Sequence, residues 1–308
     1  MSRLHRECRQ FDPVIAHQYH LGENMISVSI NVSESRFFWY LDLSWFAHSE
    51  LYKNEASEKL YSALICDGKK EEIQFPIKYK HCHSFKDNDK IFNKIKHKKN
   101  PEPINVQVAL SQILNEFHDD TIIELIDHDM FHFRPHPKIE INHNEFIVCD
   151  LYEKWHLHSL TSNKHVISQF LGSDDPVSFY NGGHVPIIGT VKTFKKILDD
   201  WIRIHISILR KEKGDTQESN DICWWAGMYS FNAVCEIHKI KMIAKNYCYI
   251  PDANSLTDEM YIGHFSVDKR FNKRNYPFIY EQDFLENDYY NMIKRWNHNM
   301  RIERWKRI

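Results

Sequence analysis

Residues 122–129 set the architecture of the chain and read Ile122-Ile123-Glu124-Leu125-Ile126-Asp127-His128-Asp129. An apolar, β-branched run of this kind is typical of a buried strand in a parallel sheet. The run ends abruptly in two aspartates that are separated by one residue. Because residues i and i+2 of an extended chain project to the same side, we expect both carboxylates to converge just beyond the strand.

Two converging carboxylates form an anionic, oxygen-only site. Ligands of an open α/β sheet usually bind at the carboxyl ends of its strands, which is where this pair is predicted to lie. Mg²⁺ or Mn²⁺ suits such oxygen ligands, and either ion in turn suits a diphosphate. The following residues 130–137 contain Pro135 and Pro137 and cannot continue as a helix. For the Asp-X-Asp triplet taken alone, a solvated turn after a strand remains the alternative.

Composition limits the class of protein. The chain has 308 residues, of which 42% are hydrophobic and 14% aromatic, so it can form a core and is not a disordered chain. Its net charge of −2 names no partner, and its 20 histidines are expected mostly at the surface. The seven cysteines are scattered without a Cys-X-X-Cys pair, which argues against a zinc ribbon and favours reduced thiols. No signal peptide or membrane span is recognisable, so we expect a cytoplasmic protein.

Strand-like and helix-like segments alternate along the chain, which predicts an α/β fold. The expected strands lie at residues 25–32, 60–66, 72–79, 121–127 and 146–149, and the expected helices at 37–52, 104–117, 191–210 and 222–240. Residues 211–220 are expected to form a surface loop. We predict one domain over residues 1–268, followed by a basic, aromatic, helical extension over 269–308 that packs on the same domain.

Two turns could line a ligand site. Ser33 and Glu34 follow the first strand, where a helix cap commonly holds a nucleotide; an ordinary strand-to-helix turn is the alternative. Gly182 and Gly183 precede His184 and would let the backbone turn tightly or approach a ligand closely, although a plain turn explains them equally well.

Two basic segments are candidate nucleic-acid contacts. Residues 86–99 read as a lysine-rich loop, and residues 290–308 combine basic side chains with tryptophans. Basic charge attracts phosphate and aromatic rings stack on bases. The alternatives are a solvated loop and a terminal helix whose apolar residues pack inward. The predicted contacts are Lys96, Lys98, Arg295, Trp296 and Arg304.

Several motifs occur in the same order as in one family. The Asp-His-Asp triplet is followed by Arg134-Pro135-His136-Pro137, then by the segment at residues 183–189, a tryptophan-rich helix at 224–229, and Ile262-Gly263-His264-Phe265. This set resembles the plant hydroxyproline O-arabinosyltransferases and the related peptidyl-serine galactosyltransferases, which are GT-A glycosyltransferases that use a nucleotide sugar. The resemblance implies a GT-A-like (Rossmann-like) fold with a mixed, mostly parallel sheet flanked by helices.

The resemblance also implies roles for particular residues. Asp127 and Asp129 would hold Mn²⁺ or Mg²⁺ on the diphosphate of a UDP-sugar. His264, which taken alone reads as a structural histidine, would be a further metal ligand.

Five more residues receive roles from the same resemblance. Gly182, Gly183 and His184 would line the sugar and acceptor cleft, and Ser33 with Glu34 would lie near the nucleotide base. The family often has an acidic residue where this chain has Gly227, so no catalytic carboxylate is assigned. Asp221 is the candidate, with Glu236 a second guess. The family favours arabinose as the sugar and retention of the anomeric configuration.

The acceptor is predicted from a different set of features. We expect no membrane anchor like that of the plant enzymes, and the basic segments favour DNA. We therefore expect transfer to hydroxymethylcytosine, as in a viral DNA-modifying relative, with the base flipped out of the duplex. A peptide hydroxyproline or serine is the alternative acceptor. A non-catalytic nucleic-acid-binding protein with a degenerate transferase fold is the alternative from another class.

Overall fold

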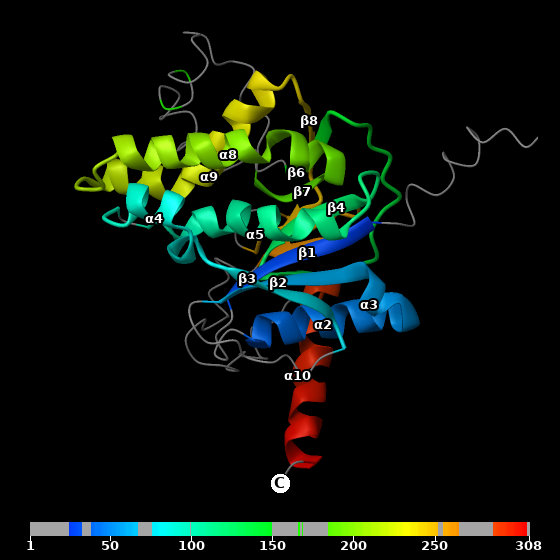
Figure 1. Ribbon diagram of the computed structural model, residues 1–308. Helices are drawn as coiled ribbons and strands as arrows, with labels where there is room; N and C mark the ends of the chain where they lie inside the picture. Colours follow the sequence, from blue (N-terminus) through cyan, green and yellow to red (C-terminus); the bar gives the residue numbers. More distant parts are fainter. Residues whose placement is uncertain are drawn as a thin grey trace, which may run out of the picture.

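Seven strands form a mixed sheet at the centre of the computed structural model (Figure 1). Their order is β3-β2-β1-β4-β7-β6-β8, and the neighbours among β3, β2, β1 and β4 are parallel. β7 runs antiparallel to both β4 and β6, while β6 and β8 are parallel. The bounds are β1 (Met25–Val32), β2 (Leu60–Cys66), β3 (Lys78–His83), β4 (Ile122–Asp127), β6 (Glu145–Cys149), β7 (His184–Thr190) and β8 (Lys241–Lys245).

A second, three-stranded sheet extends the first beyond β4. Its central strand β10 (Ile262–His264) is antiparallel to β5 (Met130–His132) and parallel to β9 (Cys248–Tyr249). The structure describes residues 25–32, 38–66, 76–98, 100–149, 166, 168, 184–251, 255–264 and 286–306.

Helices cover both faces of the large sheet (Figure 1). One face carries α2 (Phe38–Tyr52), α3 (Ala56–Lys59) and α10 (Asp288–Lys306). The other carries α4 (Asp89–Ile95), α5 (Asn105–Ile113), α8 (Val191–Lys211) and α9 (Gln217–Ile237). Short 3₁₀ turns lie at η2 (Lys53–Glu55), η3 (Phe85–Asp87), η4 (Glu102–Ile104) and η5 (Leu114–Glu116).

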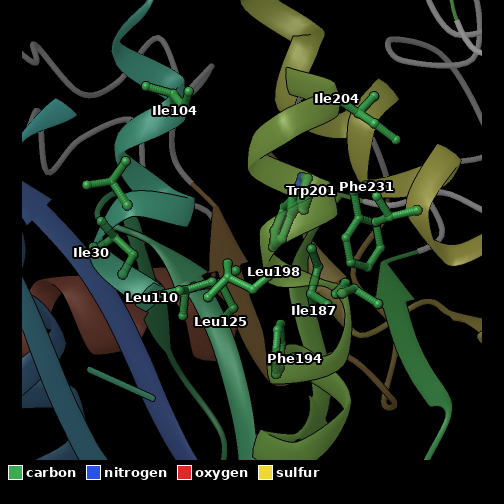
Figure 2. Close-up of a cluster of buried hydrophobic side chains, with 14 of the residues drawn as sticks. Ile30, Ile104, Leu110, Leu125, Ile187, Phe194, Leu198, Trp201, Ile204 and Phe231 are labelled. Atoms are coloured by element: carbon green, nitrogen blue, oxygen red, sulfur yellow. The ribbon is translucent and has the colours of Figure 1, made fainter. Parts of the chain in front are cut away.

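The largest hydrophobic core lies between the sheet and the α5, α8 and α9 layer (Figure 2). Leu125 of β4, Phe194 and Trp201 of α8, and Phe231 of α9 are among its buried members. β1 presents Val28 and Ile30 to this core, in keeping with the two-residue period of a strand. The alternate residues are polar: buried Asn31 Nδ2 donates hydrogen bonds to Ser29 Oγ at 2.8 Å and Ser62 Oγ at 3.0 Å.

The α/β fold with a mixed, mostly parallel sheet is confirmed, but three predicted segments are wrong in detail. The loop expected at residues 86–99 contains α4, because Asn88 caps its first turn and Ile91 and Ile95 are buried at i and i+4. The third strand lies at Lys78–His83 instead of residues 72–79; it is a polar edge strand that apolar patterning does not find. The loop expected at residues 211–220 ends early, because Thr216 caps α9 at Gln217.

The C-terminal helix packs on the same body as α2. Tyr289, Ile293 and Trp296 of α10 share a hydrophobic cluster with Trp39 and Leu43 of α2. The predicted domain boundary at residue 268 lies outside the described residues and stays a prediction. Among the described residues, no helix combines the length and apolar character that crossing a membrane requires. Six cysteines among the described residues are buried and form no disulfide with one another: Cys66, Cys82, Cys149, Cys223, Cys235 and Cys248.

Candidate metal centre at the end of the central strand

The predicted carboxylate pair lies where the strand order of the sheet reverses. β1 has β2 on one side and β4 on the other, so the chain leaves β1 in one direction and returns in the opposite direction for β4. Asp127 is the last residue of β4 and is paired in register with Ile30 of β1. The crevice at such a reversal, outside the carboxyl ends of the strands, is the usual ligand site of an open α/β sheet.

Three predicted ligands meet at this point. Asp127, Asp129 and His264 each offer a ligand atom, and these atoms all lie within 4.8 Å of one another. His264 Nε2 is 3.0 Å from Asp129 Oδ1. Pairing of β10 with β5 places His264 opposite Met130, next to the turn that carries Asp129. Asp129 and His264 are buried, whereas Asp127 is partly exposed.

Helix α2 supports the turn from one side. Ser44 Oγ donates a hydrogen bond of 2.8 Å to the carbonyl oxygen of Met130. The Tyr40 ring lies edge-on to His128, with the ring centroids 5.1 Å apart. Burial, together with the nearby negative charge of Asp129, raises the pKa of Tyr40. Tyr40 therefore stays a neutral phenol beside the carboxylate.

The donor set fits a divalent metal ion. Two carboxylates this close repel each other, and a divalent cation between them removes that repulsion. Carboxylate oxygens suit Mg²⁺ and Mn²⁺, and the imidazole nitrogen of His264 favours the transition metal of the two. The partial exposure of Asp127 leaves one side of the group accessible to a further ligand.

The other predicted site residues lie on α9 or fall, wholly or by their side chains, outside the described part of the structure. His184 begins β7 opposite Cys149, and its side chain lies outside the described part of the structure. Ser33, Glu34, Gly182 and Gly183 also lie outside it. Asp221 accepts a hydrogen bond from Gln217 on the exposed start of α9, and no contact among the described residues joins it to Asp127.

Gly227 and Glu236 lie on the same helix as Asp221, in the α9 layer. A side chain at Gly227 would meet Gln107 and His205, so this position faces helices α5 and α8. Glu236 forms an ion pair with Lys239 at 2.9 Å.

The predicted nucleic-acid contacts do not form one surface. Lys96 follows α4, whereas Arg295, Trp296 and Arg304 lie on α10, across the sheet from α4 (Figure 1). Lys96 and Arg295 are exposed, and the side chain of Arg304 is outside the described part.

Two of these contacts need correction. The prediction that Trp296 stacks on a base is wrong, because its ring is buried and its Nε1 donates a hydrogen bond of 2.8 Å to Asp42 Oδ2. Lys98 Nζ donates to the carbonyl oxygens of Arg210 and Glu212, at 3.2 Å and 2.9 Å, so it holds the end of α8.

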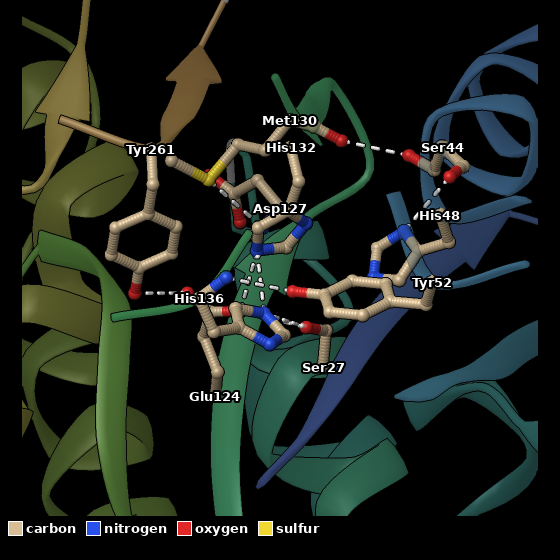
Figure 3. Close-up of polar contacts among 10 residues, drawn as sticks. All are labelled: Ser27, Ser44, His48, Tyr52, Glu124, Asp127, Met130, His132, His136 and Tyr261. Atoms are coloured by element: carbon tan, nitrogen blue, oxygen red, sulfur yellow. Dashed lines mark hydrogen bonds and ion pairs between the residues drawn. The ribbon is translucent and has the colours of Figure 1, made fainter. Parts of the chain in front are cut away.

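Sequence reasoning missed a second group of potential ligands. His48, His132 and His136 bring three ring nitrogens within 4.8 Å of one another, and Glu124 of β4 contacts two of these rings (Figure 3). One signal was present in the sequence: Glu124 is a charged residue inside an apolar strand. A buried carboxylate needs partners, so its presence predicts nearby donors or a cation.

A scan of protein-family models gives no match, and a search of curated proteins finds no similar sequence. The structure itself shows a Rossmann-like α/β fold with buried His and Asp groups that could hold a metal ion.

Proposed function

We propose that the chain is a metal-dependent glycosyltransferase that moves a sugar from a nucleoside diphosphate to a hydroxyl group. One observation carries the proposal: Asp127, Asp129 and His264 converge at the strand-order reversal of a Rossmann-like sheet. Their types and order along the chain also match the motifs of the transferases that the sequence resembles. A structural ion pair between His264 and Asp129 alone would not explain the third ligand, Asp127.

The reaction breaks the bond between the anomeric carbon and the diphosphate and forms a bond from that carbon to the acceptor oxygen. The acceptor hydroxyl loses its proton, and negative charge develops on the departing diphosphate. A divalent ion held by Asp127, Asp129 and His264 would supply Lewis-acid stabilisation of that charge.

The protein's own residues orient and enclose this centre. Asp129 and His264 are buried and fix one side of it, whereas the partly exposed Asp127 faces the side open to a donor. The neutral Tyr40 and the aromatic surface of α2 exclude water from behind the turn. Excluding water strengthens the attraction between the carboxylates and a bound cation.

For the donor we propose a UDP-sugar, with arabinose first, on the strength of the resemblance. For the acceptor we propose hydroxymethylcytosine in DNA. The exposed basic residues around Lys96 support a phosphate contact on the α4 side of the molecule. A peptide hydroxyl is the competing acceptor.

The test is turnover of a panel of UDP-sugars with Mn²⁺, with and without hydroxymethylcytosine DNA. Asp129→Asn should lower turnover by about a hundredfold or more, because it removes one charged ligand from the centre. Asp199→Asn is the matched control, since Asp199 is an exposed aspartate on α8 and its loss should leave turnover unchanged.

The outcomes separate the alternatives. Mn²⁺-dependent release of UDP that DNA stimulates, with a salt-sensitive rate, supports the whole proposal. Release that DNA does not affect keeps the transferase and moves the acceptor to a peptide. Salt-dependent DNA binding without turnover of any donor would favour the non-catalytic alternative and reject the enzyme.

A further inference from the structure

A second cluster of polar side chains is buried between α2 and β4 (Figure 3). His48 comes from α2, Glu124 from β4 and His132 from β5, and His136 follows four residues later. Glu124, His48 and His132 are 0% exposed, and the side chain of His136 is 8% exposed. The cluster is therefore closed to solvent on the described sides.

Three of these side chains aim ligand atoms at one point. His132 Nε2 is 2.8 Å and His136 Nε2 is 3.1 Å from the same carboxylate oxygen, Glu124 Oε2. The two ring nitrogens are themselves 3.0 Å apart. Ser27 Oγ lies 2.7 Å from Glu124 Oε2 and 3.0 Å from His136 Nε2. One small volume therefore holds two imidazole nitrogens, a carboxylate oxygen and a hydroxyl.

His48 faces this volume with an atom that hydrogen bonding leaves unused. Its Nδ1 lies 2.9 Å from the Ser44 carbonyl oxygen and donates to it, which leaves the lone pair on Nε2. That buried Nε2 has no hydrogen-bond partner among the described residues. A metal-bound histidine usually donates its other ring nitrogen to a carbonyl or carboxylate in this way. A buried acceptor without a partner is costly unless a cation takes its lone pair.

We propose that His48, His132, His136 and Glu124 bind a structural zinc ion. Three imidazole nitrogens and one carboxylate oxygen make a four-ligand set, and a closed set supplied wholly by the protein is typical of structural zinc. The same set is too rich in nitrogen for Mg²⁺ or Ca²⁺.

The cluster lies where three parts of the fold meet. A zinc ion there would join α2 to β4 and to the segment after β5. Tyr261, the residue before β10, donates a hydrogen bond of 2.6 Å from its hydroxyl to Glu124 Oε1 and so connects β10 to the cluster. The Tyr52 hydroxyl of α2 accepts a hydrogen bond of 2.8 Å from the backbone amide of His136. The zinc would thus hold the strands that carry Asp127, Asp129 and His264 without itself meeting the substrate.

The test is the zinc content of the full chain, purified from zinc-supplemented cells and passed through a mild chelator. We expect about one zinc per chain, with X-ray absorption showing nitrogen and oxygen ligands at about 2.0–2.1 Å. His48→Ala should reduce the retained zinc about tenfold or more and lower the melting temperature. His97→Ala, which removes an exposed histidine, should change neither quantity.

Two further measurements, on Asp129→Asn and on the wild type, make the test conclusive. Asp129→Asn should keep its zinc even if it has lost all turnover, so failure of the zinc site and failure of the transferase are distinguishable. If His48→Ala does not fold, the ligand distances of the wild type still decide. A wild type that retains no zinc after the chelator, or zinc bound by oxygen ligands alone, would overturn the proposal and leave a metal-free hydrogen-bond network.

Discussion

The two ligand groups share the same strands but differ in enclosure and chemistry. Both draw on β4 and on the chain that directly follows it, and both include a residue at or next to β10, His264 in one and Tyr261 in the other. Asp127, Asp129 and His264 offer mainly oxygen ligands with one partly exposed member, whereas the His48 group offers mainly nitrogen and is closed. If both groups bind metal as we propose, this difference predicts an exchangeable ion in the first group and a permanent one in the second.

The position of each acid on β4 explains the contrast. Glu124 lies within the strand, under α2, where solvent is excluded and every polar atom needs a protein partner or an ion. Asp127 is the last residue of the strand, where the chain turns and the crevice begins. Glu124 of the buried histidine cluster and Asp127 of the more accessible group are thus only three residues apart on one strand.

Treatment with a chelator should reveal the largest difference between the two groups. Dialysis against EDTA should lower transferase turnover by about a hundredfold or more, since an ion bound at the partly exposed Asp127 would be accessible, and added Mn²⁺ should restore turnover. Zinc measured in the same samples should stay near about one per chain, because its four ligands are all protein side chains. Loss of both ions at the same rate would show that the two groups are equally exposed.

Gly263→Ala should damage both groups together, because it displaces β10. A Cβ atom at residue 263 would overlap the ring of Tyr289, a fully buried residue of α10. Such overpacking costs about 1–3 kcal/mol of unfolding free energy, measurable by urea denaturation.

Gly227→Ala is the control with the opposite sign. A Cβ atom there would meet neighbours at ordinary distances of 3.5 Å or more, inside a helix. The substitution should therefore stabilise the chain by about 0.5–1 kcal/mol. Equal destabilisation by both substitutions would contradict the packing of α10 on β10.

His205 is a further buried histidine, outside both groups, and burial is the cause that shifts its pKa. Burial lowers the pKa of His205 to about 3, and its Nε2 has no hydrogen-bond partner in the part of the chain that the structure describes. The folded chain keeps His205 neutral while the unfolded chain protonates it below about pH 6.5, so stability falls as the pH decreases from there towards 3. Between pH 7 and pH 5 this loss amounts to about 2 kcal/mol.

His205→Phe keeps a ring in the same space and removes that titration. Urea denaturation at the two pH values should show a smaller acid-induced loss of stability for the variant than for the wild type. Identical pH dependence would mean that His205 is not held neutral by the fold.

Arg295→Ala should have the smallest effect on stability. Arg295 and Glu50 are half-exposed, and their closest atoms, Nε and Oε2, are 3.5 Å apart. Exposed pairs of this kind contribute about 0–1 kcal/mol, so the melting temperature should barely change. If Arg295 contacts DNA phosphate, the variant should instead reduce the salt dependence of DNA binding. A large fall in melting temperature would show that the pair is not a surface contact.

Strong local patterns made much of the fold predictable. The apolar runs of β1, β2 and β4 and the long periodic helices α8 and α9 were recognisable because burial fixes their residue types. The convergence of Asp127 and Asp129 was predicted from an extended chain, but the strand ends at Asp127 and the turn that follows it brings Asp129 to the same point. His264 was added by the resemblance, and pairing of β10 with β5 brings it to the same point.

The rest depended on long-range contacts. Helix α4 was not predicted, because its many lysines made the segment look like a polar loop despite the apolar pair Ile91 and Ile95. Trp296 was predicted at the surface, because its hydrogen-bond partner Asp42 lies 254 residues away in the sequence. His48 and Glu124 meet although they come from different elements, and no local spacing encodes that meeting. A charged residue in an apolar strand was the one available hint.

The most direct test of the two-group account is anomalous diffraction from one crystal grown with Mn²⁺ and UDP. The account predicts two separate peaks. Data at the zinc edge should show zinc among His48, His132, His136 and Glu124, and data that distinguish manganese should show it at Asp127, Asp129 and His264. Manganese in the histidine group, or no metal at the aspartates in the presence of UDP, would contradict it.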